Sequence, residues 1–443
     1  MTHAPLPTPP PSFETQALHA GYTPDATGAR AIPLHQTTSY VFNSTEHAAH
    51  LFALKAFGNI YTRLMNPTTD AFEQRVAALE GGIAGLAFAS GHAAISGTLL
   101  TLAQAGDHIV SSTDLYGGTH TLLQHTLPKL GIHTTFVSPA HLEENLAQWE
   151  AAIQPNTKAL FVETFGNPKL EVVDIAALAE LAHRHGLPLV VDNTLATPYL
   201  CNPIAHGADI VVHSATKFIG GQGLSLGGVV VDAGTFDWQA SGRFPSFVDP
   251  DPEYNGLPFW ETFGNLTFIL RARVHTLRNF GGTLSPFNAW TFLNGLETLA
   301  LRIEKHSRNA LHLATWLQQH PYVAWVNYPG LSNNPAYALA QQYLPKGQGA
   351  LLGFGVKGGA TVASQVINHV KLFSHVANLG DSKSLILHPA STSHSQLTAE
   401  AQAASGVTPD YIRLSVGLEA VDDLIADLDQ AIHAAVQAGA VVG

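Results

Sequence analysis

The chain has 443 residues, of which 46% are hydrophobic and only 12% are charged, and its formal net charge is −12 at pH 7. The acidic balance argues against a nucleic-acid-binding protein, which normally carries a basic surface, and the single cysteine, Cys201, excludes an intrachain disulfide framework. No apolar run reaches the ~18 residues of a membrane span, and no signal or transit peptide is visible. We therefore expect a cytoplasmic protein of two or three domains that binds neither membrane nor nucleic acid.

The N-terminal segment, residues 1–68, is predicted to form an arm. Its first 12 residues are rich in proline and threonine, a composition that is typical of extended chain. Few long periodic runs follow, and one short helix is predicted near residues 46–57.

Helical and strand patterns alternate from residue 69 to residue 268. Short apolar runs predict buried strands over residues 84–89, 108–111, 159–162, 189–191, 209–212 and 229–231. Helical spacing is found over residues 71–79, 92–105 and 175–185. This alternation predicts an α/β fold with a mostly parallel sheet and helices on both faces. In such a sheet, ligands bind beyond the carboxyl ends of the strands.

The remaining residues, 269–443, are predicted to form a smaller C-terminal α+β domain. A proline-rich, loop-like stretch over residues 234–258 precedes it, and helical patterns follow over residues 263–277 and 287–318. The domain is expected to include a strand at residues 350–356 and a helix at residues 421–436.

Polar residues follow three of the predicted strands. Asp192 closes one strand, Lys217 lies just beyond another, and Ser90, Gly91 and His92 begin the helix after a third. The N-terminus of a helix suits a phosphate, a lysine can form a Schiff base, and a carboxylate can hold a pyridinium nitrogen. Together these groups predict a site for pyridoxal phosphate, which carries a phosphate, an aldehyde and a pyridine ring.

Each of these features also has a structural explanation. A lone lysine usually lies on the surface, and an aspartate or serine at the end of a strand usually caps a turn or helix. Their occurrence at successive strand ends, with the hydroxyls of Ser214 and Thr216 beside the lysine, favours the cofactor site.

Other patterns point to three alternative kinds of enzyme. The G-x-S-x-G sequence at residues 223–227 occurs in serine hydrolases, but there it follows a strand and precedes a helix, whereas here a strand follows it. The glycines at positions 221, 223 and 227 have one residue too many for the G-x-G-x-x-G fingerprint of a dinucleotide enzyme, and no helix follows them. The 24 histidines show no convincing ligand spacing, so no metal site is predicted.

Several longer motifs are spread along the chain: YTRLMNPTTDAFEQRVAALEGG (61–82), DLYGGTH (114–120), ETFGNP (163–168), VVDNT (190–194), HSATKFIGG (213–221), NLGDSKSLILHPAS (378–391) and YIRLSVGLE (411–419). Through these motifs the chain, from about residue 15 to the C-terminus, resembles the Cys/Met-metabolism family of pyridoxal-phosphate enzymes. The resemblance implies the type I fold of pyridoxal-phosphate-dependent transferases. It also implies a homo-oligomer, expected to be a dimer of dimers.

The resemblance implies roles for particular residues. Lys217 resembles the Schiff-base lysine, Asp192 the partner of the ring nitrogen, and Tyr116 the tyrosine that stacks on the ring. Arg413 resembles the arginine that binds the substrate carboxylate, a contact for which a planar guanidinium is suited. These four residues are expected to carry most of the chemistry.

Further residues are implied in binding. The expected phosphate-binding residues are Ser90, Gly91, His92, Ser214 and Thr216, with Tyr61 and Arg63 reaching the phosphate of the neighbouring subunit. Asn167 is expected near the cofactor's 3-hydroxyl and the substrate, Asn378 near the substrate, and Glu163 as a carboxylate behind these residues. Gln222 stands where relatives of the GGHG type carry histidine, and the contact it makes is left open.

The implied reaction is a γ-replacement that converts O-acetyl-L-homoserine and sulfide to L-homocysteine and acetate. The YGGT sequence, the proline-rich loop and NLGDSKSLILHPAS favour this branch of the family. The alternatives are an O-succinylhomoserine sulfhydrylase or a cystathionine γ-synthase. A methionine γ-lyase is less favoured, because many γ-lyases carry cysteine where this chain has Gly118.

Overall fold

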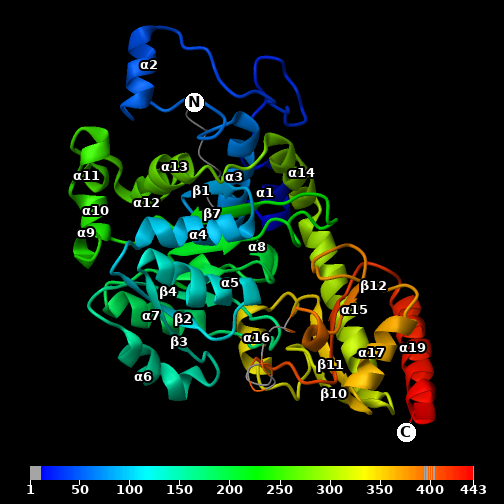
Figure 1. The fold of residues 1–443 in the computed structure, drawn as a ribbon. Helices are drawn as coiled ribbons and strands as arrows, with labels where there is room; N and C mark the ends of the chain where they lie inside the picture. The colour runs from blue at the N-terminus through cyan, green and yellow to red at the C-terminus, as the bar shows by residue number, and fades with distance from the viewer. Residues whose placement is uncertain are drawn as a thin grey trace.

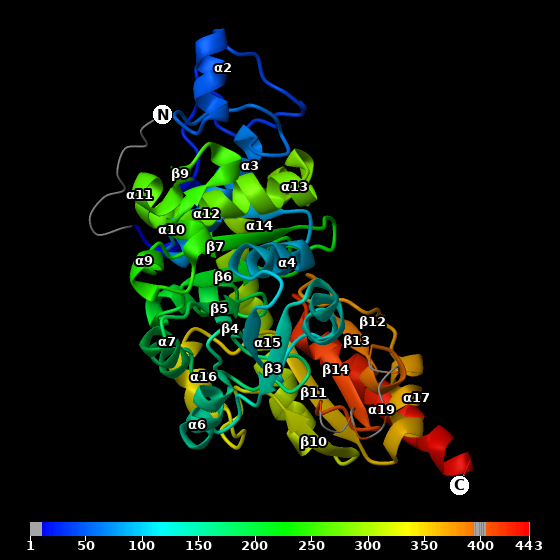
Figure 2. The ribbon, with the colours of Figure 1, turned by 60° about the vertical axis from the view of Figure 1, so that its left-hand side comes forward.

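The structure is a computed structural model that describes residues 11–442 except positions 394, 396, 397, 399, 401, 403 and 404. Most of the proline-rich N-terminal stretch, residues 1–10, lies outside the described residues. Two sheets, covered by helices, form the body of the molecule, and the segment with α2 (Thr45–Phe52) projects from it (Figures 1 and 2). Among the described helices, none combines the length and apolar character needed to cross a membrane.

The larger sheet has seven strands in the order β1-β7-β6-β5-β4-β2-β3. Its strands are β1 (Ala84–Phe88), β2 (His108–Ser112), β3 (His133–Val137), β4 (Thr157–Glu163), β5 (Leu189–Asp192), β6 (Ile210–His213) and β7 (Gly228–Asp232). Strand β7 runs opposite to the other six strands, which are parallel to one another, so the expected mostly parallel sheet is confirmed. Alternate residues of β5 and β6 are buried on opposite faces of the sheet. This confirms the prediction, from their continuous apolar sequences, that these strands are buried on both faces.

Helices cover both faces of this sheet. One face packs on α3 (Pro67–Glu80), α7 (Ile175–Arg184), α8 (Thr197–Leu200) and α14 (Pro286–Glu297). The other packs on α4 (Gly91–Leu102) and on the segment that contains α9 (Trp238–Ser241), α10 (Pro245–Val248), α11 (Phe259–Phe263), α12 (Thr267–Arg271) and α13 (Arg278–Phe280). Short α5 (Gly117–Thr121), α6 (Leu142–Ala152) and α1 (Phe13–His19) complete this part of the chain.

The smaller sheet has five strands in the order β10-β11-β14-β13-β12. They are β10 (Val323–Asn327), β11 (Leu351–Val356), β12 (Ser374–His375), β13 (Leu385–Leu387) and β14 (Tyr411–Ser415). Its helices are α15 (Leu299–Gln319), α16 (Tyr337–Tyr343), α17 (Gly359–His369) and α19 (Val421–Val442). Residues of α15 contribute to the cores of both sheets, so this helix joins the two parts of the molecule. The division at residues 68 and 268 remains a prediction.

Some predicted elements differ from those in the structure. The stretch expected to be loop holds α9, α10 and the short hairpin of β8 (Pro250–Asp251) and β9 (Leu257–Pro258). The helix expected over residues 263–277 is interrupted, because Gly264 adopts φ = 53° and a π-helical turn covers Ala272–Leu277. The helix expected over residues 287–318 is two helices that meet at Thr298. Strand β3 was not predicted, because its residues are only partly buried and lack a long apolar run.

Candidate active site

The carboxyl ends of β4, β5 and β6 meet at one edge of the larger sheet and bring three polar segments together. In the strand register, Glu163 pairs with Asp192, and Asp192 pairs with Val212. Strand β1 is parallel to β6, because both pair antiparallel with β7. The Ser90 segment therefore emerges at the same edge, where a Cβ on Gly91 would lie 2.6 Å from the Cβ of Ser214. Parallel topology thus gathers residues that are more than one hundred positions apart.

Lys217 lies where this edge meets the smaller sheet. Its Nζ donates a hydrogen bond to Oδ1 of Asn378 over 2.6 Å. The loop after Asn378 packs on the lysine backbone at Gly380, whose φ is +76° and whose added Cβ would lie 2.7 Å from the nitrogen of Phe218. Burial, followed by the positive charge of Arg413, lowers the pKa of Lys217 from 10.5 to about 8. A substantial fraction of the amine is therefore neutral near pH 8 and able to accept a proton or attack a carbonyl.

Arg413 approaches this amine from β14 of the smaller sheet. Its side chain is buried, and one terminal nitrogen, Nη2, donates to the backbone oxygen of Asn378 over 2.9 Å. Its Nε is buried without a partner among the described residues. Burial lowers the pKa of this guanidinium, and a buried cation with a free N–H is suited to bind a carboxylate.

Asp192 presents its carboxylate at the end of β5. Oδ1 accepts hydrogen bonds from the backbone nitrogen of Thr194 at 3.0 Å and from its hydroxyl at 2.5 Å. Burial raises the pKa of Asp192, whereas these hydrogen bonds and the charges of His213 and His92 oppose the rise. A cationic ligand atom beside Asp192 would favour the ionised carboxylate further.

The start of α4 has the features of an anion site. The hydroxyl of Ser90 accepts a hydrogen bond from the nitrogen of Ala93 over 3.1 Å. The backbone N–H groups of Gly91 and His92 have no partner among the described residues. Since free N–H groups at a helix N-terminus favour negative charge, a phosphate fits here.

The two hydroxyls expected at the phosphate are placed differently. Ser214 lies against Gly91, and its backbone nitrogen donates to the hydroxyl of Thr194 over 2.8 Å. The hydroxyl of Thr216 instead contacts Gly227, donating to its oxygen at 3.2 Å and accepting from its nitrogen at 3.0 Å. Thr216 therefore braces the loop after β6, and its hydroxyl would have to leave the Gly227 oxygen to donate to a ligand.

Tyr116 and Asn167 border the same edge. The ring of Tyr116 is 52% exposed and contacts His92 edge-on, with 5.7 Å between ring centroids. Its backbone nitrogen donates to Oε1 of Glu163 over 2.6 Å, so Glu163 fixes the backbone that carries the ring. Burial, followed by the charge of Asp192, raises the pKa of Glu163. Oδ1 of Asn167 is buried with no partner among the described residues, and it could accept a hydrogen bond from a ligand hydroxyl.

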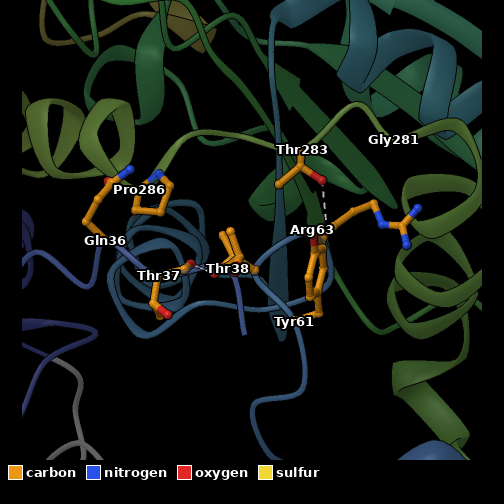
Figure 3. Close-up of a pocket in the computed structure, with 9 residues that line it drawn as sticks. Gln36, Thr37, Thr38, Tyr61, Arg63, Gly281, Thr283 and Pro286 are labelled. Carbon is orange, nitrogen blue, oxygen red and sulfur yellow. Dashed lines mark hydrogen bonds between the residues drawn. The ribbon is translucent and has the colours of Figure 1, made fainter. Parts of the chain in front are cut away.

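Tyr61 and Arg63 lie apart from this group. They border a pocket of about 380 Å³ whose lining also includes Thr37, Thr283 and Pro286 (Figure 3). The Arg63 guanidinium carbon is 5.8 Å from the Tyr61 ring centroid, and the Arg63 backbone oxygen accepts a hydrogen bond from the Thr283 hydroxyl. Among the described residues, the lining of this pocket includes none of the group formed by Lys217, Asn378, Arg413 and Asp192, called the Lys217 group below. Within one chain, therefore, the two residues do not join the expected phosphate site.

Some residues of the site were not singled out in the sequence. Thr194 bridges Asp192 and Ser214, and its signal is the D-x-T spacing, in which an aspartate accepts from the residue two positions on. Gln222, whose contact was left open, is exposed in the loop after Lys217. The neighbouring backbone oxygen of Gly221 accepts from both the nitrogen and the hydroxyl of Ser382.

A separate cluster of titratable residues joins the end of α15 to α19. His320 donates from Nε2 to Oδ1 of Asp429 over 3.2 Å, and Nε2 of His433 lies 3.7 Å from the same oxygen. Because Nδ1 of His320 accepts from the backbone nitrogen of Tyr322, the ring proton resides on Nε2. That tautomer is suited to a hydrogen bond with Asp429 and not to metal ligation.

The residues at the sheet edge fit pyridoxal phosphate. Lys217 offers an amine for the aldehyde, Asp192 a carboxylate for the ring nitrogen, and the start of α4 two free N–H groups for the phosphate. The partnerless Asn167 oxygen and Arg413 nitrogen are buried polar atoms that a bound ligand would satisfy.

Known proteins resemble this chain over nearly its whole length. The O-acetyl-L-homoserine sulfhydrylase of Leptospira meyeri is 55% identical, over 95% of this chain and 96% of its own. The homocysteine synthase of Schizosaccharomyces pombe is 52% identical, over 96% of this chain and 98% of its own. A crystal structure of a putative O-acetylhomoserine (thiol)-lyase from Campylobacter jejuni, which contains a pyridoxyl-lysine phosphate, matches with a TM-score of 0.92 and 43% identity, covering 95% of this chain and 99% of that one. The model of the family described as "Cys/Met metabolism PLP-dependent enzyme" matches residues 14–433, and the chain belongs to this family of pyridoxal-phosphate enzymes.

Proposed function

We propose that this protein is an O-acetylhomoserine sulfhydrylase, which converts O-acetyl-L-homoserine and sulfide to L-homocysteine and acetate by γ-replacement. The observation that carries the proposal is the arrangement of Lys217, Asn378 and Arg413. A desolvated amine and a buried guanidinium with a free N–H are joined through one asparagine. The names of the relatives in Leptospira meyeri and Schizosaccharomyces pombe support the choice of ester and product.

Each residue of this group has a task that follows from its surroundings. Arg413 binds the carboxylate of the amino acid, because its guanidinium is buried and its Nε has no partner among the described residues. This contact fixes the α-carbon within reach of Lys217. Lys217 takes up and returns protons at Nζ, since its pKa of about 8 lies close to the working pH. Asn378 orients Nζ of Lys217 and, by accepting hydrogen bonds from both side chains, holds the amine and the Arg413 guanidinium in fixed positions relative to each other.

The bound cofactor supplies an electron sink for the charge that develops when a proton leaves the substrate. Asp192 would hold a proton at the pyridine nitrogen, and its two hydrogen bonds from Thr194 fix the position of the carboxylate. The N–H groups of Gly91 and His92 would hold the phosphate. Tyr116 would pack on the ring, and Glu163 fixes the backbone that carries this side chain.

Gly118 bears on the alternative of a methionine γ-lyase. A Cβ at this position would lie 2.6 Å from Nε2 of His92 and 2.6 Å from Cε1 of Tyr116. A cysteine there would displace one of these rings, so the glycine supports the sulfhydrylase branch.

The proposed working assembly is a homo-oligomer, a dimer of dimers, in the cytoplasm. Tyr61 and Arg63 lie away from the Lys217 group of their own chain, and they are expected to reach the phosphate of a neighbouring subunit. The substrates are small molecules, an amino acid ester and sulfide or a thiol.

The test is an assay of the purified protein with O-acetylhomoserine or O-succinylhomoserine, each with sulfide or cysteine. We expect homocysteine from the acetyl ester and sulfide, and a clear preference for another pair would overturn the assignment. Lys217→Ala should lose turnover and the visible cofactor absorption together, whereas Lys129→Ala, at an exposed site, should keep both. Turnover by Lys217→Ala equal to that of the unmodified enzyme would remove the lysine from its role.

A further inference from the structure

Glu80 is a fully buried carboxylate that the proposed mechanism does not use. It is the last residue of α3, where Asn66 caps the start of the helix and Gly81, with φ = 75°, ends it. Its Oε1 accepts two hydrogen bonds, from Nε2 of His213 over 2.6 Å and from Nδ2 of Asn193 over 2.8 Å. One oxygen therefore ties the end of α3 to the ends of β5 and β6.

The two partners of Glu80 are the sequence neighbours of cofactor-site residues. Asn193 directly follows Asp192, and His213 directly precedes Ser214. Because side chains alternate along a strand, Glu80 holds its partners on one face of the sheet while Asp192 faces the other. This matches the cores, since Val191 and Val211 pack on the α3 side and Val190 and Val212 on the α4 side.

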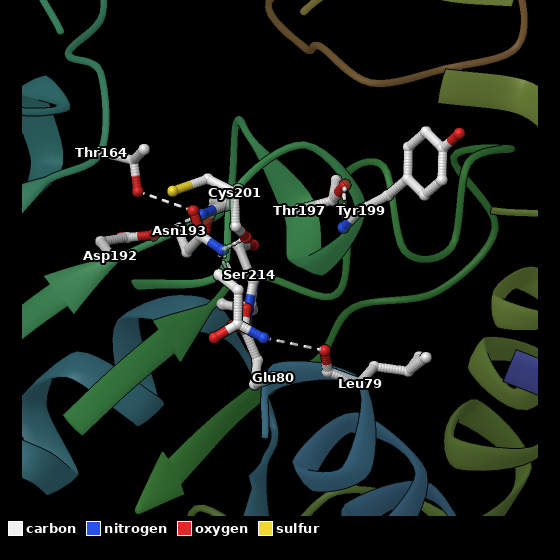
Figure 4. A network of polar contacts seen from close by, with 12 residues as sticks. Leu79, Glu80, Thr164, Asp192, Asn193, Thr197, Tyr199, Cys201 and Ser214 are labelled. Atoms are coloured by element: carbon white, nitrogen blue, oxygen red, sulfur yellow. Dashed lines mark hydrogen bonds and ion pairs between the residues drawn. The ribbon is translucent and has the colours of Figure 1, made fainter. Parts of the chain in front are cut away.

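The network around Asn193 leaves this residue little freedom. Its Oδ1 accepts from the hydroxyl of Thr164 over 2.6 Å, and its Nδ2 also donates to the backbone oxygen of Cys201 over 3.0 Å. Figure 4 shows Thr164, Asn193 and Glu80 joined in this way, with Asp192 directly beside Asn193. Three separate segments thus fix the residue next to Asp192.

The network also holds polar atoms that stability alone does not explain. Oε2 of Glu80 and Nδ1 of His213 are buried without partners among the described residues. Buried ionic groups of this kind are often less stabilising than apolar residues of similar volume, and one reason for their retention is that they specify a geometry. Here the specified geometry is the spacing of two strand ends that carry the cofactor site.

We propose that Glu80 is a positioning residue of the cofactor site, which sets the separation between Asp192 and Ser214 from the rear face of the sheet. Thr194 links the same two residues from the front, through its contacts with the Asp192 carboxylate and the Ser214 nitrogen. The ring nitrogen and the phosphate of one rigid ligand must meet both residues at once, so their spacing governs cofactor affinity. This inference rests on the cofactor site described under Proposed function.

The test measures cofactor affinity in the absence of amino acid substrate. Holoenzyme is dialysed against graded concentrations of pyridoxal phosphate, and the visible absorption gives the dissociation constant. Glu80→Ala removes both hydrogen bonds, whereas Glu80→Gln keeps an oxygen that accepts them. Glu73→Ala is the matched control, because Glu73 is also a buried carboxylate of α3. Glu73 accepts hydrogen bonds from Arg273 and from the backbone nitrogen of Ala87, and not from His213 or Asn193.

We expect Glu80→Ala to raise the cofactor dissociation constant by about tenfold or more, as loss of residues that orient ligands commonly does. Glu80→Gln should retain most of the cofactor affinity. Glu73→Ala should keep the dissociation constant within about threefold of that of the unmodified enzyme. Both substitutions should lower the midpoint temperature of unfolding. Affinity that is unchanged in Glu80→Ala, or that falls as far in Glu73→Ala, would reduce Glu80 to a structural role and overturn the inference. If Glu80→Ala does not fold, the test rests on Glu80→Gln, which still accepts both hydrogen bonds. A cofactor dissociation constant about tenfold above that of the unmodified enzyme would then overturn the inference, and an unchanged dissociation constant would support it. Failure of the unmodified protein to bind pyridoxal phosphate would instead overturn the proposed function.

Discussion

Replacement of Lys217 by methionine should stabilise the cofactor-free protein at pH 7. Burial and the charge of Arg413 lower the lysine pKa from 10.5 to about 8. This shift means that holding a charged amine in the site reduces the free energy of unfolding by about 3 kcal/mol. Methionine removes that charge and keeps a similar length. It also leaves Oδ1 of Asn378 without its donor, which costs about 1 kcal/mol. The net expected gain in unfolding free energy is about 2 kcal/mol.

The gain should depend on pH with a definite sign. Between pH 8 and 10.5 the unfolded chain binds the lysine proton more tightly than the folded chain, so the stability of the unmodified protein rises with pH in this window. The advantage of Lys217→Met should therefore shrink by about 2 kcal/mol between pH 7 and pH 9.5.

Urea unfolding of the cofactor-free proteins, followed by circular dichroism at both pH values, measures these differences. Lys129→Met, at an exposed position, is the control and should show no gain at either pH. If Lys217→Met is no more stable than the unmodified protein at pH 7, or its gain is equal at the two pH values, Lys217 is not desolvated in the folded protein.

Three further changes probe Arg413 and Gly91 of the site and Glu171, a partly buried carboxylate outside it. Arg413→Ala should raise the KM for the amino acid by roughly 10- to 100-fold, through loss of a charge-assisted hydrogen bond, and should leave the visible cofactor band in place; an unchanged KM would refute its role. Gly91→Ala should weaken cofactor binding in the same dialysis assay, because the added Cβ would lie 2.6 Å from the Cβ of Ser214; unaltered affinity would show that this close approach is unnecessary. Burial and the charge of Asp114 raise the pKa of Glu171 to about 7, so the native state prefers the protonated acid and loses stability as pH rises from about 4.5 to 7. Glu171→Gln should therefore gain about 1 to 2 kcal/mol in unfolding free energy over the unmodified protein between pH 5 and pH 8, less than the full pKa shift corresponds to, because solvent screens this partly exposed carboxylate. A difference that does not change with pH would contradict the assignment.

The chemistry at the ends of the parallel strands could be predicted from the sequence. Asp192 and Lys217 each follow an apolar strand pattern, and Ser90 to His92 follow another, so the rule that parallel strands end at one edge places them together. The family motifs then supplied residues that no local pattern identifies, such as Arg413 and Asn378.

The interruptions of the helices and the short strands of the smaller sheet were not predictable in the same way, although its strand β11 was. The segment from α11 to α13 has the apolar spacing of one helix, but Gly264 at φ = 53° and a π-helical turn over Ala272–Leu277 interrupt it. Strands β12 and β13 have only two and three residues, too few for a periodic pattern.

The sequence alone determined the fold class, the family and the end of the sheet at which the reactive lysine lies, because these follow from local periodicity and from motifs along the chain. Only the tertiary structure decided which distant groups act on one another. The pKa of Lys217 depends on burial and then on the charge of Arg413, which lies 196 positions later in the chain. Glu80 reaches the strand ends only because α3 ends behind them. Desolvation and charge act through space, and a residue's distance along the chain does not record them.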